Sequence, residues 1–212
     1  MKILKNFVVF EGIDGSGTTT QLNRLENFFL TNREVKRFPP FYKTSEPTNS
    51  SIGHLIRAGL RKETVLKEET IALLFAADRN EHLYGPNGIA ERCGREELVV
   101  CDRYFPSSLV YQGITCGDAL PDLLNRDFPG PELLLFFDID PIEAQDRIAH
   151  RELKEIYEYL DFQIQVRQRY KELFPRLEKE GVKVETINAS LPPDKVALEV
   201  WNHVEKMPIF NR

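Results

Sequence analysis

Short apolar runs alternate along the chain with longer segments of mixed composition. Uniformly apolar residues occupy 7–10, 98–101 and 133–137, and weaker runs lie at 41–44 and 184–187. A half-exposed strand alternates apolar and polar residues, whereas the main runs are apolar throughout. They therefore predict strands that are covered on both faces. Buried strands separated by helices are typical of a parallel sheet.

Between these runs, apolar residues recur at the spacing of a helix, most clearly in residues 22–29 and 71–75. Residues 140–143 (DPIE) are typical of a helix start, with an N-cap, a proline at the first helical position and a following glutamate. Further helices are predicted at 159–180 and 193–204. The pattern predicts an α/β three-layer sandwich, in which a five-stranded parallel sheet is flanked by helices.

The length and net charge of the chain limit its domain number and the classes of partner that we expect. The chain has 212 residues, which suits one well-packed domain, so we expect a single domain over residues 1–212. The net charge is -5 and no long lysine or arginine run occurs, which argues against a nucleic-acid partner. Neither a signal-peptide pattern nor a transmembrane-length apolar stretch is present, so we expect no membrane partner and a cytoplasmic location.

Charged residues follow three of the predicted strands. Glu11 and Asp14 follow the first, Asp102 and Arg103 follow the run at 98–101, and residues 138–140 (DID) follow the run at 133–137. Ligands of parallel α/β sheets bind beyond the carboxyl ends of the strands. We therefore expect the functional site at this edge of the sheet.

The segment GIDGSGTTT, residues 12–20, lies between the first predicted strand and a helical pattern. It matches the phosphate-binding loop G-x-x-x-x-G-K-[ST], whose glycines let backbone N–H groups approach phosphates and whose last hydroxyl binds Mg²⁺. Thr19 has the hydroxyl position, but Thr18 stands where the loop expects lysine. The alternative is a glycine-rich turn that binds nothing. The predicted phosphate-binding residues are Gly12, Gly15, Ser16, Gly17, Thr18, Thr19 and Thr20.

A second motif, ALLFAADR, ends at Arg79. Phe75 and Arg79 are four residues apart and share one helical face, where they could stack a base and hold a phosphate. The alternative is that Phe75 belongs to the core and Arg79 pairs with a carboxylate such as Asp78 or Glu81.

A third motif, DRYFPSSLVYQG, begins at Asp102. Asp102 could hold Mg²⁺ through water, as the carboxylate after a buried strand does in many phosphoryl-transfer enzymes. Arg103 offers two parallel N–H donors to a phosphate. The polar residues that follow could read a base edge, or could simply begin a helix. They are Ser107, Ser108, Tyr111 and Gln112.

Together the segments FEGIDGSG-TTQ, LLFAADR, DRYFPSSLVYQG and HRELKEIYEYLDFQ resemble thymidylate kinase, from Phe10 to about Ser190. The resemblance implies a P-loop NTPase fold and transfer of phosphate from ATP to dTMP, with Mg²⁺ as cofactor. It also implies a lid at approximately 148–160 and a homodimer, the latter by analogy alone.

The resemblance also implies a role for each matching position. On the acceptor side it places Asp14 at the sugar 3′-hydroxyl, Phe75 against thymine, and Arg79 and Arg103 around the monophosphate. It assigns the base-side positions to Ser108, Tyr111 and Gln112. On the donor side it assigns Arg147, Asn188 and Ala189 to ATP and its adenine.

Three positions depart from the family pattern. Thr18 replaces the loop lysine, Ser45 replaces the arginine of an R-E-P segment, and the lid stretch 154–158 has no arginine. Phosphoryl transfer relies on placed positive charge, so an active enzyme is expected to take it from another cation. The candidates are Arg147, Arg151 and Lys154, and the predicted catalytic residues are Arg103, Arg151 and Lys154.

Two other interpretations remain open from the sequence. The chain could be another nucleoside-monophosphate kinase, or a deoxynucleoside kinase with Glu46 as the general base for a 5′-hydroxyl. It could also be a nucleotide-binding protein with impaired catalysis, because Thr18 and the lid both lack the expected cation.

Overall fold

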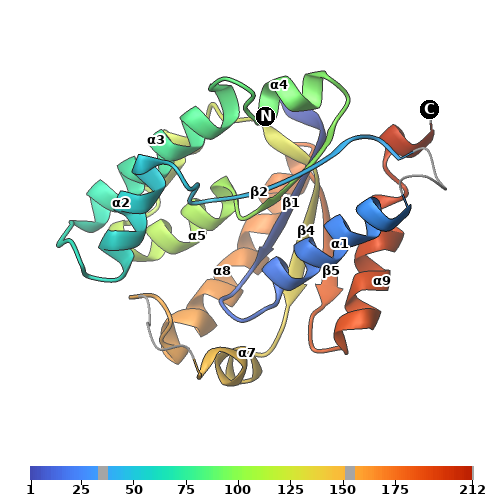
Figure 1. Ribbon diagram of the computed structural model, residues 1–212. Coiled ribbons are helices and arrows are strands. Elements are labelled where there is room, and N and C mark those ends of the chain that lie inside the picture. The colour runs from blue at the N-terminus through green and yellow to red at the C-terminus, as the bar shows by residue number, and fades with distance from the viewer. Residues whose placement is uncertain (33–37, 151–155, 212) are drawn as a thin grey trace.

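The computed structural model describes residues 1–32, 38–150 and 156–211, and its centre is one parallel β-sheet (Figure 1). The strands are β1 (Ile3–Gly12), β2 (Phe41–Ser45), β3 (Leu98–Asp102), β4 (Gly130–Asp138) and β5 (Lys183–Asn188). They lie in the order β2-β3-β1-β4-β5, and every neighbouring pair is parallel. The predicted α/β fold with a five-stranded parallel sheet is confirmed.

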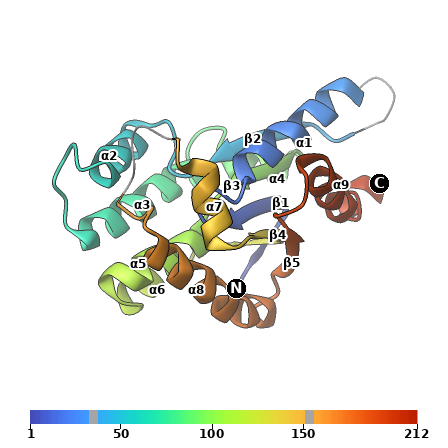
Figure 2. The ribbon, with the colours of Figure 1, turned by 90° about the horizontal axis from the view of Figure 1, so that it is seen from below.

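Helices cover both faces of this sheet. They are α1 (Thr18–Asn32), α2 (Ser51–Leu60), α3 (Glu68–Tyr84), α4 (Ile89–Gly94), α5 (Phe105–Cys116), α6 (Ala119–Asn125), α7 (Pro141–Ile148), α8 (Leu160–Lys179) and α9 (Pro193–Val204), with a 3₁₀ turn at Pro208–Asn211. Figure 2 shows α1 and α9 on one side of the sheet and α5 and α8 on the other. The three predicted layers are therefore present.

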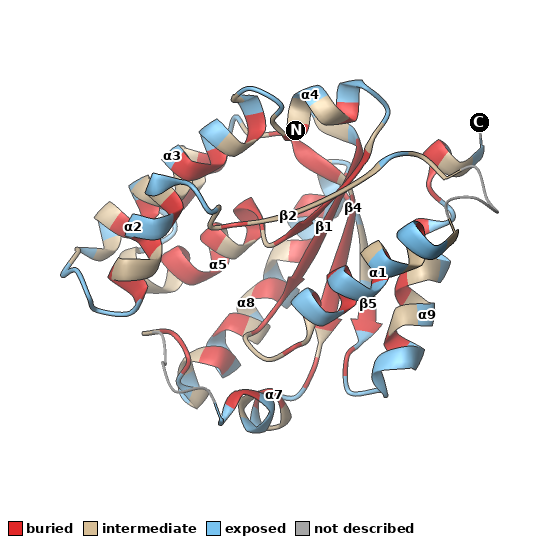
Figure 3. Cartoon of the chain, in the orientation of Figure 1, coloured by how far each residue is buried: buried red, intermediate tan, exposed pale blue. Residues whose placement is uncertain are grey.

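The uniformly apolar runs become the central strands because both of their faces are covered. In β1 the residues from Phe7 to Phe10 are fully buried, as is all of β3 except Asp102 (Figure 3). The edge strands β2 and β5 are only partly buried, which explains their weaker sequence pattern. Buried apolar surface of this kind supplies most of the stabilisation of such a domain.

The register of the strands brings the predicted site residues together. Phe10 pairs with Asp102 and Gly12 with Phe137, so the carboxyl ends of β1, β3 and β4 lie side by side. Beyond β4, the side chain of Asp140 caps α7 by accepting a hydrogen bond from the N–H of Ile142, as the DPIE pattern predicts. None of the described helices is both long enough and apolar enough to cross a membrane.

Candidate active site

The loop after β1 has the tight backbone that phosphate binding requires. Gly15 and Gly17 have φ values of 87° and 92°, a region that residues with a side chain rarely adopt. A Cβ on Gly15 would lie 2.2 Å from the carbonyl oxygen of Ala144, so the loop packs directly against α7. The loop then enters α1 at Thr18, where free N–H groups and the helix dipole favour an anion.

This loop forms the floor of a cleft of about 630 Å³, here called the donor cleft. Among the described residues that line it, the cations are Arg103 and Arg147 and the carboxylates are Asp14, Glu46 and Asp102. Of the predicted phosphate-binding residues, those from Gly15 to Thr20 line the cleft. Gly12 lies beneath it, where a Cβ would come within 2.4 Å of the Ser16 hydroxyl.

Arg147 stands at the far wall of the donor cleft. Its guanidinium donates to the Ala189 carbonyl oxygen at 3.0 Å and pairs with Glu143 at 2.7 Å. Glu143 thus binds Arg147 and the Ser190 hydroxyl. The wall here is otherwise apolar, formed by Ile148, Ala189, Leu191, Pro193 and Val196. Such a surface suits a planar base more than a phosphate. Asn188, which the resemblance assigns to ATP, is exposed, and its side-chain oxygen accepts a hydrogen bond from the Ser190 N–H.

The two predicted magnesium residues lie in direct contact. The Thr19 hydroxyl donates to Asp102 Oδ2 at 2.5 Å, and Asp102 Oδ1 is buried with no hydrogen-bond partner among the described residues. No group of three or more histidine, cysteine or carboxylate side chains that could bind a metal occurs in the described part of the chain. One hydroxyl and one carboxylate fit Mg²⁺, which usually keeps waters and phosphate oxygens as its other ligands.

A smaller pocket of about 110 Å³, here called the acceptor pocket, lies beside the donor cleft. Its lining includes the predicted substrate residues Asp14, Phe75, Arg79, Arg103, Ser108, Tyr111 and Gln112. These residues come from the β1 loop, α3 and the β3–α5 segment, so the fold unites three motifs that are far apart in the sequence.

Arg79 lies in the wall of the acceptor pocket and is only 1% exposed. Its guanidinium pairs with Glu46 at 2.7 Å and donates to the Ser108 hydroxyl at 3.0 Å and to Asn125. The expected pairing with a carboxylate is therefore present, but the partner is Glu46 and neither Asp78 nor Glu81. Glu46 neutralises the charge of Arg79 within the protein, and the role of Arg79 beside the monophosphate stays a prediction.

Arg103 is the one described cation that lines both the donor cleft and the acceptor pocket. Its backbone φ of 69° lies in the left-handed region, which turns the chain sharply between β3 and α5. The guanidinium pairs with Asp14 at 2.6 Å and donates to the hydroxyls of Ser107 and Tyr111. Burial lowers the pKa of Arg103, but Tyr111 and Asp14 raise it, and the pKa stays well above its ordinary value. The charge is therefore permanent.

Comparison with known proteins matches this chain to a family model described as thymidylate kinase, over residues 10–200. Three of the similar proteins are named putative or probable thymidylate kinase. The Treponema pallidum protein is 41% identical over 97% of this chain and 98% of its own length. The Pyrobaculum aerophilum protein is 37% identical over 96% and 98%, and the Aeropyrum pernix protein is 41% identical over 84% and 82%.

The chain belongs to the thymidylate kinase family. The family match covers the donor cleft, the acceptor pocket and the segment between α7 and α8. The resemblance on which the residue roles rest is thereby confirmed, and the roles themselves remain predictions. Two of the predicted catalytic residues, Arg151 and Lys154, lie outside the described residues, as does most of the stretch 151–158.

Two residues of this family member were missed by sequence reasoning. Gln163, on α8, accepts from the Asp14 N–H at 3.1 Å and donates to Asp14 Oδ2 at 2.8 Å. It also donates to the carbonyl oxygen of Tyr157 at 2.7 Å. Gln163 therefore holds Asp14 by both backbone and side chain. Its spacing in the sequence could have revealed it. Gln163 precedes Val166 by three residues and Tyr170 by seven, which places this polar side chain on the buried face of α8.

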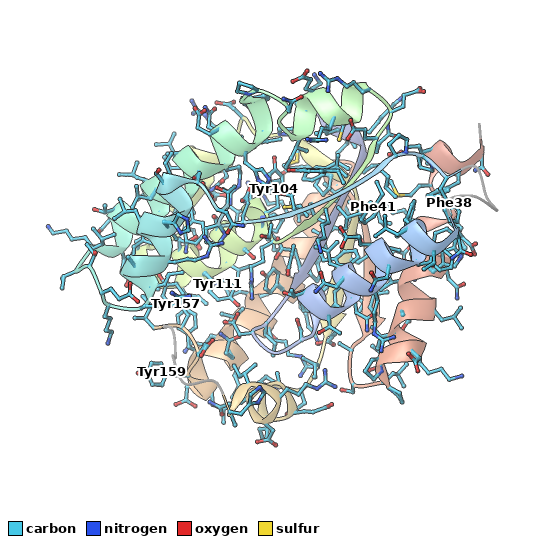
Figure 4. The ribbon with its side chains drawn as sticks, viewed as in Figure 1. Phe38, Phe41, Tyr104, Tyr111, Tyr157 and Tyr159 are labelled. Carbon is cyan, nitrogen blue, oxygen red and sulfur yellow. The ribbon has the colours of Figure 1, made fainter. Side chains whose placement is uncertain are left out.

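Tyr157 lines the acceptor pocket. Its ring stacks on Phe162 at 5.0 Å between centroids and lies 5.8 Å from the ring of Tyr111, and Figure 4 shows Tyr111 and Tyr157 side by side near α5. Its hydroxyl donates to Glu68, at the start of α3, at 2.6 Å. Burial raises the pKa of Tyr157 far above its ordinary range, so the hydroxyl stays protonated and keeps donating.

Proposed function

We propose that this protein transfers the γ-phosphoryl group of ATP to dTMP and forms dTDP and ADP. Family membership supports this reaction. The single structural observation that carries it is the place of Arg103, whose side chain lines both the donor cleft and the acceptor pocket. A cation between two nucleotide sites stabilises the charge on the group that passes from one to the other.

In this proposal the acceptor phosphate lies on Arg103 with one oxygen in line with the γ-phosphorus. That oxygen is already anionic, so no protein side chain has to act as a base, and Glu46 is engaged with Arg79 instead. Catalysis then consists of positioning and electrostatic stabilisation. Thr19 and Asp102 would hold Mg²⁺, which would supply positive charge beside the phosphates of ATP.

The acceptor pocket also supports a thymine base. Phe75 offers a ring for stacking, and the buried network of Arg79, Ser108 and Gln112 offers donors and acceptors to the base edge. Gln112 Oε1 is buried with no hydrogen-bond partner among the described residues, so an N–H of the base would satisfy it. Asp14 lies at the junction of loop and pocket, where the sugar hydroxyl is expected.

The test is a coupled assay of ADP release with ATP, Mg²⁺ and a panel of dTMP, dUMP, dCMP, AMP and thymidine. We expect the largest kcat/KM with dTMP. A higher value with AMP would assign another monophosphate kinase, and phosphorylation of thymidine alone would assign a nucleoside kinase. Binding of both nucleotides without ADP release would support the interpretation as a nucleotide-binding protein with impaired catalysis. The family relationship favours none of these three outcomes.

We further propose a homodimer and a cytoplasmic location, on the family resemblance alone. Light scattering coupled to size exclusion tests the first. A mass of one chain, 24.6 kDa, at assay concentration would contradict it.

A further inference from the structure

Glu11 is a fully buried carboxylate at the end of β1, directly before the phosphate-binding loop. It lines neither the donor cleft nor the acceptor pocket, and the reaction described above gives it no role. A buried carboxylate is costly unless its oxygens accept hydrogen bonds. Its partners therefore indicate what it stabilises.

Among the described residues, the partners of the Glu11 carboxylate are donors close to Arg103 or on α8. Oε1 accepts from the N–H of Tyr104 at 3.0 Å and of Ser107 at 3.3 Å. Oε2 accepts from the Ser107 hydroxyl at 2.6 Å and the Tyr170 hydroxyl at 2.7 Å. Tyr104, the N-cap residue of α5, makes no side-chain cap bond of its own. Glu11 thus supplies, from the neighbouring strand, the acceptor that caps this helix.

Ser107 links Glu11 to the arginine. Its hydroxyl donates to Glu11 and receives a hydrogen bond from Arg103 at 3.2 Å. Arg103 occupies a left-handed backbone conformation, so the turn needs contacts that hold it there. The Arg103 N–H donates to Phe10, next to Glu11 on β1, at 2.9 Å. The turn is therefore attached to the end of β1 at the backbone and through the Glu11 side chain.

We propose that Glu11 is a positioning residue for Arg103: its ionised carboxylate fixes Ser107 and the start of α5, and thereby orients the guanidinium that receives the acceptor phosphate. The inference deepens the proposed function and rests on it, because it assumes that Arg103 binds the acceptor. Glu11 acts through Ser107 and the turn and has no contact with substrate.

The ionisation of Glu11 gives the proposal a distinctive readout. Burial raises the pKa of Glu11 to about 7, although Arg103 and the hydrogen bonds of Ser107, Tyr170 and Tyr104 lower it. The carboxylate is thus ionised above neutral pH and protonated below it. The titratable and charged groups that face it are Cys101 on β3, Arg103 and Tyr104 in the turn, and Tyr170 on α8.

The test compares wild type with Glu11→Gln, which keeps the shape and removes the charge. The KM for the acceptor should rise about tenfold at about pH 8.5, while the KM for ATP changes less than about twofold. The ratio of the two acceptor KM values should fall toward one at about pH 6, where wild-type Glu11 is itself neutral. Taking this ratio at each pH cancels the titration of the substrate phosphate. A ratio that does not change with pH would mean a merely structural role and would overturn the proposal.

Two further variants keep the test decisive if Glu11→Gln does not fold. Ser107→Ala removes the link to Arg103, and Tyr170→Phe removes one donor to Glu11. Both should raise the acceptor KM and leave the ATP KM nearly unchanged, and unchanged acceptor KM values would overturn the proposal. Glu132→Gln is the matched control, because Glu132 accepts the Asn6 N–H at 2.6 Å at the other end of the sheet and should change neither KM.

The acceptor is chosen from the panel by the highest wild-type kcat/KM. If that acceptor is not dTMP, the proposed function fails while the role of Glu11 is still measured with the acceptor that works. If no acceptor is phosphorylated, the affinities of dTMP and AMP, measured by calorimetry, replace the KM values. Equal affinities in wild type and Glu11→Gln would overturn the Glu11 proposal alone.

Discussion

The acceptor pocket and the donor cleft share Arg103, but they obtain their electrostatics in different ways. In the acceptor pocket, charged side chains are already paired within the protein: Arg79 with Glu46, and Arg103 with Asp14. The phosphate-binding loop of the donor cleft, in contrast, presents mainly backbone and hydroxyl groups. The described lining of the cleft carries two arginines and three carboxylates, and Thr18 adds no charge.

This difference indicates where each half is vulnerable. A preorganised pocket loses its geometry when one buried partner is removed, because the other partner is left unsatisfied. A cleft of amides and hydroxyls tolerates single side-chain changes but depends on added cations to bind four negative charges on ATP. The acceptor half should therefore respond to mutation of its network, and the donor half to metal and to cations from the stretch 151–155.

The largest effect is expected at the residue that both halves share. Arg103→Ala should lower kcat by about 10³, because it removes a placed cation from the transferred group. Calorimetry should show ATP affinity changed by no more than about threefold, since the phosphate loop and Arg147 remain. Arg103→Lys is the informative companion variant, because it keeps the charge but loses the planar guanidinium whose separate nitrogens donate to Asp14 and Tyr111. Undiminished turnover in Arg103→Ala would contradict the shared role.

The second effect concerns metal in the donor cleft. Asp102→Asn should lower kcat by about 10² at low Mg²⁺ and should recover in part when Mg²⁺ is raised, because the weakened site binds the ion less tightly. A titration of activity against Mg²⁺ measures the shift in half-activation. Asp118→Asn is the control, since Asp118 pairs with Arg169 on the surface. Identical Mg²⁺ curves for Asp102→Asn and wild type would remove Asp102 from the metal site.

The same contrast explains how far the sequence could predict the molecule. The central strands were predictable because burial on both faces favours apolar residues throughout, as at residues 98–101 of β3. The donor loop was predictable because its glycines are required locally, by positive φ at Gly15 and Gly17. Features that depend on local backbone chemistry leave a pattern in a short stretch of sequence.

The acceptor network was less predictable because its partners lie far apart in the chain. Arg79 bonds Glu46 and Asn125, and Gln163 bonds Asp14 across a separation of 149 residues. A polar residue on a buried helix face signals that a partner exists, but only the fold selects the partner. For this reason the sequence named Arg79 as a site residue but did not name Glu46 and Asn125 as its partners.

The third prediction addresses the cation that Thr18 does not supply. Lys154→Ala or Arg151→Ala should lower kcat by about 10² if that side chain provides the missing charge. Adding Thr18→Lys to whichever of these two variants lowers kcat should raise kcat again about tenfold. A lysine at the start of α1 would put positive charge at the β- and γ-phosphates. Thr18→Ser is the control that changes size without charge. If neither Lys154→Ala nor Arg151→Ala lowers kcat, the hypothesis that these residues supply the missing positive charge is wrong.

The smallest effect is expected where the acceptor half meets the donor loop. Gln163→Leu removes three hydrogen bonds, two to Asp14 and one to Tyr157, without changing side-chain volume greatly. Asp14 remains paired with Arg103, so we expect the dTMP KM to rise about five- to tenfold and kcat to fall less than about threefold. Gln168→Leu is the matched control on α8, because the side chain of Gln168 donates to the neighbouring Glu172 on the surface. Equal KM values for the two variants would show that Asp14 is positioned without Gln163, by Arg103 and Tyr111, and the acceptor half would then be as tolerant of mutation as the donor cleft.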